Sequence, residues 1–346
     1  MSDPVPQFTP VTLITGFLGS GKTTLLQRLL RDPALADTAV LINEFGEVGL
    51  DHHLLERIDE RTVLLQSGCL CCTVRGELAD AMRDLHSRRA RGAVPVFRRV
   101  VIESTGLADP FPVLTTLHAD PVLKHHFRMA TVVTTVDAVN GARTLADHVE
   151  SVKQVAVADH IVLTKADLAD AAATASVERR VRAINPAAPL IRNPDLPTVS
   201  AAILAGDASA SLQRDPLTDA WFAHELRTAG SDQDRRHADD IHAFAIVLDR
   251  PLDWTAFGMW LTMLLHRYGN EVLRVKAILN IAGTDTPVAV HGVQHLVHPP
   301  VHMQAWPDGD RRSRIVFIVK SLDRASIERS LAVFCGLDAE AAKAVA

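Results

Sequence analysis

The fold is decided by residues 11–30, which read VTLITGFLGSGKTTLLQRLL. An apolar run suited to a buried strand leads into GFLGSGKT at residues 16–23, and apolar residues with helical spacing follow. In this pattern, G-x-x-x-x-G-K-[ST], backbone N–H groups wrap a phosphate and the positive end of the next helix faces it. We therefore predict a phosphate-binding P-loop, with Lys22 on the β- and γ-phosphates and Thr23 on Mg²⁺. The alternative is a glycine-rich turn without a ligand.

Residues 11–193 alternate apolar runs of strand length with helical patterns, which predicts an α/β domain. Its unbroken apolar strands indicate a parallel sheet with helices on both faces, the P-loop NTPase arrangement. Strands are expected at 11–15, 38–42, 62–65, 100–102, 131–136, 160–163 and 190–191, and helices at 22–30, 77–89, 112–118, 142–158 and 177–184.

The rest of the chain divides into a linker and a second domain. Residues 194–240 are rich in proline, alanine and serine and are predicted to form a linker with one short helix. Residues 241–346 predict a small α+β domain, with one sheet and helices on one of its faces. We therefore assign residues 1–193, 194–240 and 241–346 to a P-loop domain, a linker and a C-terminal domain.

The apolar run at residues 100–102 is followed by the sequence ESTG. After a P-loop, a carboxylate such as Glu103 at the end of a strand holds Mg²⁺, and the N–H of Gly106 is placed to meet the γ-phosphate. The alternative is a solvated carboxylate. Leu107 stands where a water-positioning glutamine would follow Gly106, so Glu44 or a partner is expected to supply that role. We predict catalytic roles for Lys22, Glu103 and Glu44 and slow intrinsic hydrolysis.

A later strand ends in TKAD at residues 164–167 and is similar to the guanine-reading N-K-x-D loop. In such a loop, Asp167 accepts hydrogen bonds from the ring N–H and the exocyclic amine of guanine, and Lys165 packs on the base. Adenine lacks this donor pair, so the loop predicts GTP as the nucleotide. Thr164 departs from the usual asparagine, and a plain helix cap is the alternative.

Three cysteines, Cys69, Cys71 and Cys72, lie within four positions, which predicts a metal site rather than a disulfide framework. Thiolates bind Zn²⁺ and Cu⁺, and three of them leave one tetrahedral position open, which suits a metal that is passed on. His52 and His53 are candidate fourth ligands, but exposed histidines at the start of a helix are the interpretation that these two residues favour. The alternatives are buried cysteines acting as small hydrophobes or a redox switch.

The composition argues against several other classes of function. The net charge is −5 and aromatic residues make up 5% of the chain, so we expect no nucleic-acid partner. The first residues show no secretory signal and no apolar run is long enough to span a bilayer, so we expect a cytoplasmic protein without a membrane partner.

Together, these motifs resemble the CobW-type family of P-loop metallochaperone GTPases. The matching stretches are residues 16–23, 43–51, 68–72, 103–106 and 164–167, and residues 244–320 look like the family's C-terminal domain. Cys69, Cys71 and Cys72 would then hold the transferred metal, and Thr23 and Glu103 would hold Mg²⁺. The predicted nucleotide-binding set is Gly16, Gly19, Ser20, Gly21, Lys22, Thr23, Thr24, Gly106, Thr164, Lys165 and Asp167.

The resemblance implies a GTP-hydrolysing metal chaperone that delivers Zn²⁺ to a client metalloprotein. The cysteines lie between residues 43–51 and 103–106, so ordering of these segments by the γ-phosphate and Mg²⁺ would switch metal affinity. Co²⁺ delivery for cobalamin synthesis or nitrile hydratase is the alternative metal. A regulatory GTPase with inert cysteines, an ATP-dependent small-molecule kinase and a non-catalytic module are alternatives of other classes. A homodimer is one of the assemblies left open.

Overall fold

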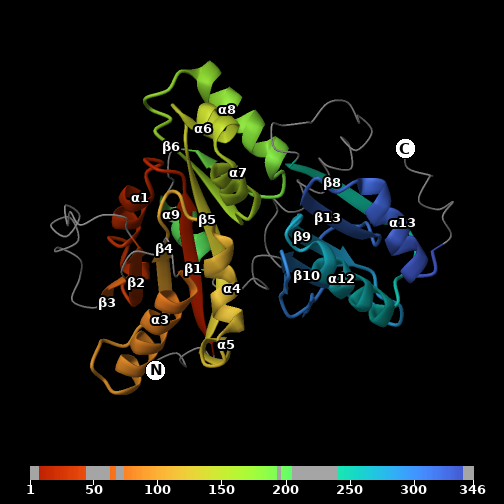
Figure 1. Ribbon diagram of the computed structural model, residues 1–346, viewed down its shortest axis with the longest axis horizontal. Helices are drawn as coiled ribbons and strands as arrows, with labels where there is room; N and C mark the ends of the chain where they lie inside the picture. The colour runs from red at the N-terminus through yellow and green to blue at the C-terminus, as the bar shows by residue number, and fades with distance from the viewer. Residues whose placement is uncertain (1–7, 44–62, 68–73, 193–195, 205–240, 338–346) are drawn as a thin grey trace. The chain divides into compact units, whose positions relative to one another are not determined.

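The computed structural model of the 346-residue chain describes residues 8–43, 63–67, 74–192, 196–204 and 241–337. The chain divides into two compact units, one built on a parallel sheet and the other on an antiparallel sheet (Figure 1). Each unit has its own apolar core, as expected for a chain with two domains.

Seven parallel strands form the first sheet, in the order β3-β2-β4-β1-β5-β6-β7. They are β1 Thr9–Gly16, β2 Thr38–Asn43, β3 Val63–Ser67, β4 Arg99–Glu103, β5 Phe127–Asp137, β6 His160–Thr164 and β7 Leu190–Arg192. Because parallel strands end at one edge, the loops that follow them gather there. The strand β1 is central in this sheet, and the P-loop therefore begins in the middle of that edge.

Helices cover both faces of this sheet. The described helices of this unit are α1 Lys22–Leu29, η1 Pro33–Leu35, α3 Val74–Ala90, α4 Phe111–Ala119, α5 Leu123–His126, α6 Gly141–Asp147, α7 Val149–Ala156, α8 Ala171–Ile184 and α9 Leu196–Leu204. Buried residues of α1 and α9 pack in one cluster with Val133 of β5. Its neighbour Thr134 faces the other side of the sheet, where its hydroxyl donates to the carbonyl of Gln154 in α7. The predicted parallel sheet with helices on both faces is confirmed.

The single helix predicted over residues 142–158 is wrong. The structure has two helices, α6 and α7, and His148 between them is extended, with φ −132° and ψ 112°. The ring of His148 stacks on Phe17 of the P-loop, with ring centroids 4.4 Å apart. The spacing of apolar residues, on which the helix prediction depends, carries no information about this contact. The contact joins the residue between the two helices to the P-loop.

In the residues that the structure describes, the second unit is an antiparallel sheet with two helices, so the expected α+β layer is confirmed. Its strands are β8 Ile241–Leu248, β9 Val272–Leu279, β10 Val288–Val293, β11 Leu296–Val297, β12 Val301–His302 and β13 Ser313–Lys320, and its helices are α12 Trp254–Tyr268 and α13 Arg324–Phe334. The order is β11-β10-β9-β13-β8, with β12 paired to β10. Asp253 and Asp323 cap the two helices, and both helices bury residues in one cluster with Phe317.

Among the residues that the structure describes, no helix combines the length and the apolar composition needed to cross a bilayer.

The aromatic core of the second unit gives a test of this packing. Phe317 is 0% exposed, stacks on Phe244 at 5.5 Å and meets Trp260 edge-on at 6.2 Å. We expect Phe317→Ala to lower the free energy of unfolding by about 3–5 kcal/mol, because it loses transfer energy and leaves a cavity. Urea denaturation followed by tryptophan fluorescence measures the change. Val333→Ala, at a residue 80% exposed, is the control and should shift it by less than about 0.5 kcal/mol. Equal effects of the two substitutions would contradict this account of the core.

Candidate nucleotide site

The P-loop starts with a glycine that no other residue could replace without strain. Gly16 has φ 142°, a region that residues with a side chain rarely adopt. A Cβ atom there would also lie 2.3 Å from Thr135 Oγ1 and 2.5 Å from the Thr135 carbonyl oxygen. The loop then runs to Gly21, the left-handed N-cap of α1, so backbone N–H groups and the helix N-terminus lie at the strand ends.

Buried hydroxyl groups hold this loop from the strands beside β1. Ser20 Oγ lies 2.6 Å from Thr135 Oγ1 at the end of β5, and Thr164 Oγ1 of β6 donates to the Ser20 carbonyl at 2.7 Å. The same Thr164 hydroxyl is 3.2 Å from the Val136 carbonyl. The threonine that stands in place of the usual asparagine therefore has a side chain that hydrogen bonds to the P-loop backbone. A direct role of Thr164 in reading guanine stays a prediction.

Oxygen atoms suited to a magnesium ion meet where α1 and β4 face each other. Thr23 Oγ1 donates to Glu103 Oε1 at 2.6 Å, and Glu103 is 3% exposed. A hydroxyl and a carboxylate are hard oxygen donors, the type that Mg²⁺ prefers, so these two residues fit the ion. Nearby, Lys22 Nζ donates to the carbonyls of Gly16 at 2.9 Å and Phe17 at 3.2 Å, which lays its side chain along the loop.

The chain after β4 packs directly against the P-loop. Ser104 N donates to the Ile14 carbonyl at 3.0 Å, and Ser104 Oγ donates to Thr15 Oγ1 at 2.9 Å. A Cβ atom on Gly106 would lie 2.6 Å from both the N and the Cα of Leu18. Only glycine allows this approach, so the predicted phosphate-sensing Gly106 is in contact with the predicted phosphate-binding loop.

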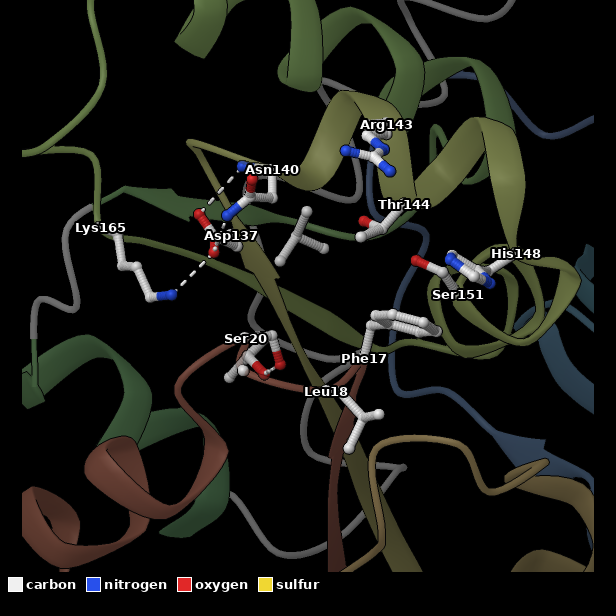
Figure 2. A pocket seen from close by; sticks show the side chains of 13 residues that line it. Phe17, Leu18, Ser20, Asp137, Asn140, Arg143, Thr144, His148, Ser151 and Lys165 are labelled. Carbon is white, nitrogen blue, oxygen red and sulfur yellow. Dashed lines mark hydrogen bonds and ion pairs between the residues drawn. The ribbon is translucent and has the colours of Figure 1, made fainter.

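An ion pair that the sequence analysis did not predict joins the predicted guanine loop to the end of β5. Lys165 has a left-handed φ of 55°, and its Nζ lies 2.8 Å from Asp137 Oδ2 at the end of β5 (Figure 2). Asp137 also accepts hydrogen bonds from the N–H of Val139 at 2.7 Å and from Asn140. A carboxylate at the end of an apolar strand is the signal that pointed to Glu103, and it could have identified Asp137. Asp167 and Thr24 are both exposed, so a ligand has access to them.

A cavity of about 270 Å³ lies beside the P-loop, on the side of β5 and the loop after β6. Phe17, Ser20, His148 and Ser151 surround it together with the Asp137–Lys165 pair (Figure 2). Its residues come from the P-loop, the end of β5, the helices α6 and α7 and the loop after β6. The nucleotide-binding edge is therefore hollow on the side where the predicted base-reading loop lies.

Several predicted site residues lie outside the described part of the chain. They are Glu44, His52, His53, Cys69, Cys71 and Cys72. The described strands nevertheless fix where the chain enters those segments. In the sheet register, Ile42 of β2 is the partner of Glu103, and Asn43 is the partner of Ser67 of β3. Within the described ranges, no group of three or more His, Cys, Asp or Glu residues could hold a metal ion.

Two family comparisons cover most of the chain. Residues 10–192 match the family described as CobW/HypB/UreG, nucleotide-binding domain, and residues 241–335 match the cobalamin synthesis protein cobW C-terminal domain. The chain belongs to the CobW/HypB/UreG family. The predicted family and fold class are thereby confirmed, and so is the predicted enzyme class, a P-loop GTPase.

Curated and solved relatives agree with this membership. The zinc chaperone YjiA of Escherichia coli is 33% identical over 94% of this chain and 98% of its own length. The zinc chaperone CobW of Pseudomonas aeruginosa is 31% identical over 93% of this chain and 90% of its own length. The crystal structure of Zn(II)-bound YjiA GTPase from E. coli superposes with a TM-score of 0.70 at 28% identity, covering 95% of this chain and 99% of that chain.

The environment of Asp137 makes its contribution to stability depend on pH. Burial alone would raise its pKa, but Lys165, the N–H groups of Val139 and Asn140 and the Asn140 side chain outweigh burial and lower the pKa below 3.8. A carboxylate with a lowered pKa stabilises the fold above its unfolded-state pKa and loses that contribution as pH falls through its folded-state pKa. Asp137→Asn should therefore have a lower free energy of unfolding than the wild type at neutral pH. This difference in free energy, the stability gap, should narrow below about pH 4.

Urea denaturation at several pH values between 3 and 7 measures this gap. Asp170→Asn is the control, because Asp170 is an exposed carboxylate at the start of α8 that forms no ion pair among the described residues. A gap for Asp137→Asn that stays constant down to pH 3 would contradict the assignment.

Proposed function

We propose that this GTPase is a zinc chaperone that binds Zn²⁺ through Cys69, Cys71 and Cys72 and releases it to a client metalloprotein under nucleotide control. One observation carries the proposal: β4, β2 and β3 are adjacent and in register at their carboxyl ends. The pairs Ile42–Glu103 and Asn43–Ser67 place the entry to the cysteine segment two strands from Glu103. At a strand spacing of about 4.8 Å, this separation is about 10 Å.

This register supports a coupling between nucleotide and thiolates. Glu103 is hydrogen bonded to Thr23 of the P-loop, and Cys69 is two residues beyond Ser67 of β3. A shift of the β4 end on nucleotide binding would pass through β2 to β3, because the strands share ladder hydrogen bonds. Residues 44–62 and 68–73 continue from these strands, and we assign to them the metal-dependent part of the switch.

On the nucleotide side, we assign the triphosphate to the P-loop, with Lys22 on the β- and γ-phosphates and Gly106 beside the γ-phosphate. Thr23 and Glu103 would hold Mg²⁺, which when bound neutralises phosphate charge during hydrolysis. The loop at Lys165 and Asp167 would select guanine. The Lys165–Asp137 pair keeps the backbone of that loop in place, and Glu44 is our candidate for positioning the attacking water.

The choice of zinc rests on ligand chemistry and on relatives. Three thiolates suit Zn²⁺, and proteins matched along nearly their whole length are named zinc chaperones. Co²⁺ is the second candidate metal. We place the protein in the cytoplasm, where a reducing milieu keeps such thiols free. The partner that we propose is a client metalloprotein, and a homodimer is the assembly that we would test.

Metal binding gives the first test. We expect the protein purified with a non-hydrolysable GTP analogue to bind one Zn²⁺ per chain, and the Cys69/Cys71/Cys72→Ser variant to lose it. Cys335→Ser is the matched control, because burial and the charge of Asp253 raise the pKa of that thiol and make it a poor ligand. Inductively coupled plasma mass spectrometry after gel filtration measures the stoichiometry. If the triple variant retains the zinc, the protein is better regarded as a regulatory GTPase with inert cysteines.

The Mg²⁺ assignment gives a separate test. Glu103→Gln keeps an oxygen acceptor for Thr23 but removes the charge. We expect the Mg²⁺ concentration for half-maximal GTP hydrolysis to rise by about tenfold or more, with GDP affinity in EDTA unchanged. Glu328→Gln, on α13 of the other unit, is the control and should leave the Mg²⁺ requirement unaltered. An unchanged requirement in Glu103→Gln would remove Glu103 from the ion site.

A further inference from the structure

One glutamine inside the first unit has a side chain that packing alone does not explain. Gln154 of α7 is 0% exposed, and its Nε2 donates to the Gly106 carbonyl at 3.2 Å and to the Ala108 carbonyl at 3.1 Å. Two carbonyl acceptors fix which way the amide faces, because a flipped amide would set Oε1 against both oxygens.

The other half of this amide is not satisfied. Gln154 Oε1 is buried and finds no hydrogen-bond partner among the residues that the structure describes. An unsatisfied buried acceptor destabilises a fold, and a methionine of similar volume would remove this acceptor together with the two hydrogen bonds that Nε2 donates. The glutamine therefore keeps one unsatisfied oxygen while its Nε2 binds two carbonyls of one loop, the loop that contains Gly106.

The rest of α7 fastens the same loop. Lys153 Nζ lies 2.7 Å from Asp109 Oδ2, and the Thr134 hydroxyl of β5 donates to the Gln154 carbonyl at 2.8 Å. The helix is thus anchored to the sheet on one side and to residues 106–109 on the other. The start of the loop is held separately, since Ser104 binds the backbone and side chain of β1.

These contacts fix the orientation of one peptide group. The peptide between Gly106 and Leu107 is planar and trans, so its carbonyl and its N–H point in opposite directions. With the carbonyl held toward Gln154, the N–H of Leu107 points away from α7, and rotation of this peptide requires the Gln154 bond to break. Gly106 is pressed against Leu18 of the P-loop, so this peptide group borders the predicted position of the γ-phosphate.

We propose that Gln154 is a positioning residue for nucleotide hydrolysis, which sets the orientation of the Gly106–Leu107 peptide group beside the P-loop. It acts through the loop and does not touch the nucleotide. This inference rests on GTP hydrolysis at the P-loop and is independent of the metal proposal.

Steady-state kinetics of the full-length protein test the proposal. In Gln154→Met, we expect kcat for GTP to fall about tenfold or more, while the dissociation constant for GDP stays within about twofold. The thermal midpoint should change little, because the substitution removes the unsatisfied oxygen but also the two hydrogen bonds to the Gly106 and Ala108 carbonyls. Gln27→Met makes the same chemical change in α1, away from the loop, and should leave kcat unchanged.

A second variant, Gln154→Glu, has a readout that a purely structural role would not give. Its carboxylate would face two carbonyl oxygens, whereas its protonated form can donate to one of them. The neighbouring charged groups, Lys153 and Asp109, remain paired with each other. We expect kcat of Gln154→Glu relative to wild type to rise as pH falls from 8 to 5.5, and the ratio for Gln154→Met to stay flat.

The outcomes separate this inference from the function on which it rests. Wild-type kcat in Gln154→Met, or a flat pH ratio in Gln154→Glu, would overturn the inference and leave the GTPase standing. An equal loss of GDP binding and of kcat in both variants would make Gln154 a general scaffold residue and would also overturn it. If the wild-type protein failed to hydrolyse GTP, the proposed function would fall, and this inference with it.

Discussion

The rest of the structure depends on the 2.6 Å hydrogen bond between Thr23 Oγ1 and Glu103 Oε1. It joins the first turn of the P-loop helix to the end of β4, and β4 lies between β1 and β2. Thr23 and Glu103, the predicted Mg²⁺ ligands, would thus connect a bound phosphate to the edge of the sheet. The strands are parallel and in register, so Glu103 of β4 lies beside Ile42 of β2, and Ser67 of β3 lies one strand further along the sheet. The predicted metal thiolates follow Ser67 by two to five residues.

Neutral hydroxyl groups hold the P-loop on the strands beside β1. Ser20, Thr135 and Thr164 form hydrogen bonds below the loop and out of solvent. Such a network adds no charge to compete with a phosphate, yet it fixes the backbone whose N–H groups would bind it. The ion pair of Asp137 with Lys165 lies at the base-reading end, where Lys165 has a left-handed backbone. The charges of Asp137 and Lys165 thus lie where the polar edge of the predicted guanine base would bind.

Sequence patterns predicted the strands, the P-loop and the assignment of Thr23 and Glu103 to one Mg²⁺ site, because each depends on local spacing and on the shared edge of a parallel sheet. The break at His148 could not be predicted, since the ring of this residue stacks on Phe17, 131 positions earlier in the chain. Gln154 could not be predicted either: in sequence it is one polar residue in an amphipathic helix, and its partners lie 46 and 48 residues away. The cysteine roles remain predictions, because those residues lie outside the described part of the chain.

The most direct test of the central claim is the dissociation constant of Zn²⁺, measured by chelator competition in the nucleotide-free, GDP-bound and GTP-analogue-bound protein. The account predicts that the triphosphate and diphosphate forms differ by about tenfold or more, which is a coupling free energy of about 1.4 kcal/mol. The same factor should appear in the ratio of nucleotide affinities with and without zinc, because linkage is reciprocal. Identical zinc affinities in all three forms would contradict the account and leave a GTPase whose cysteines serve another purpose.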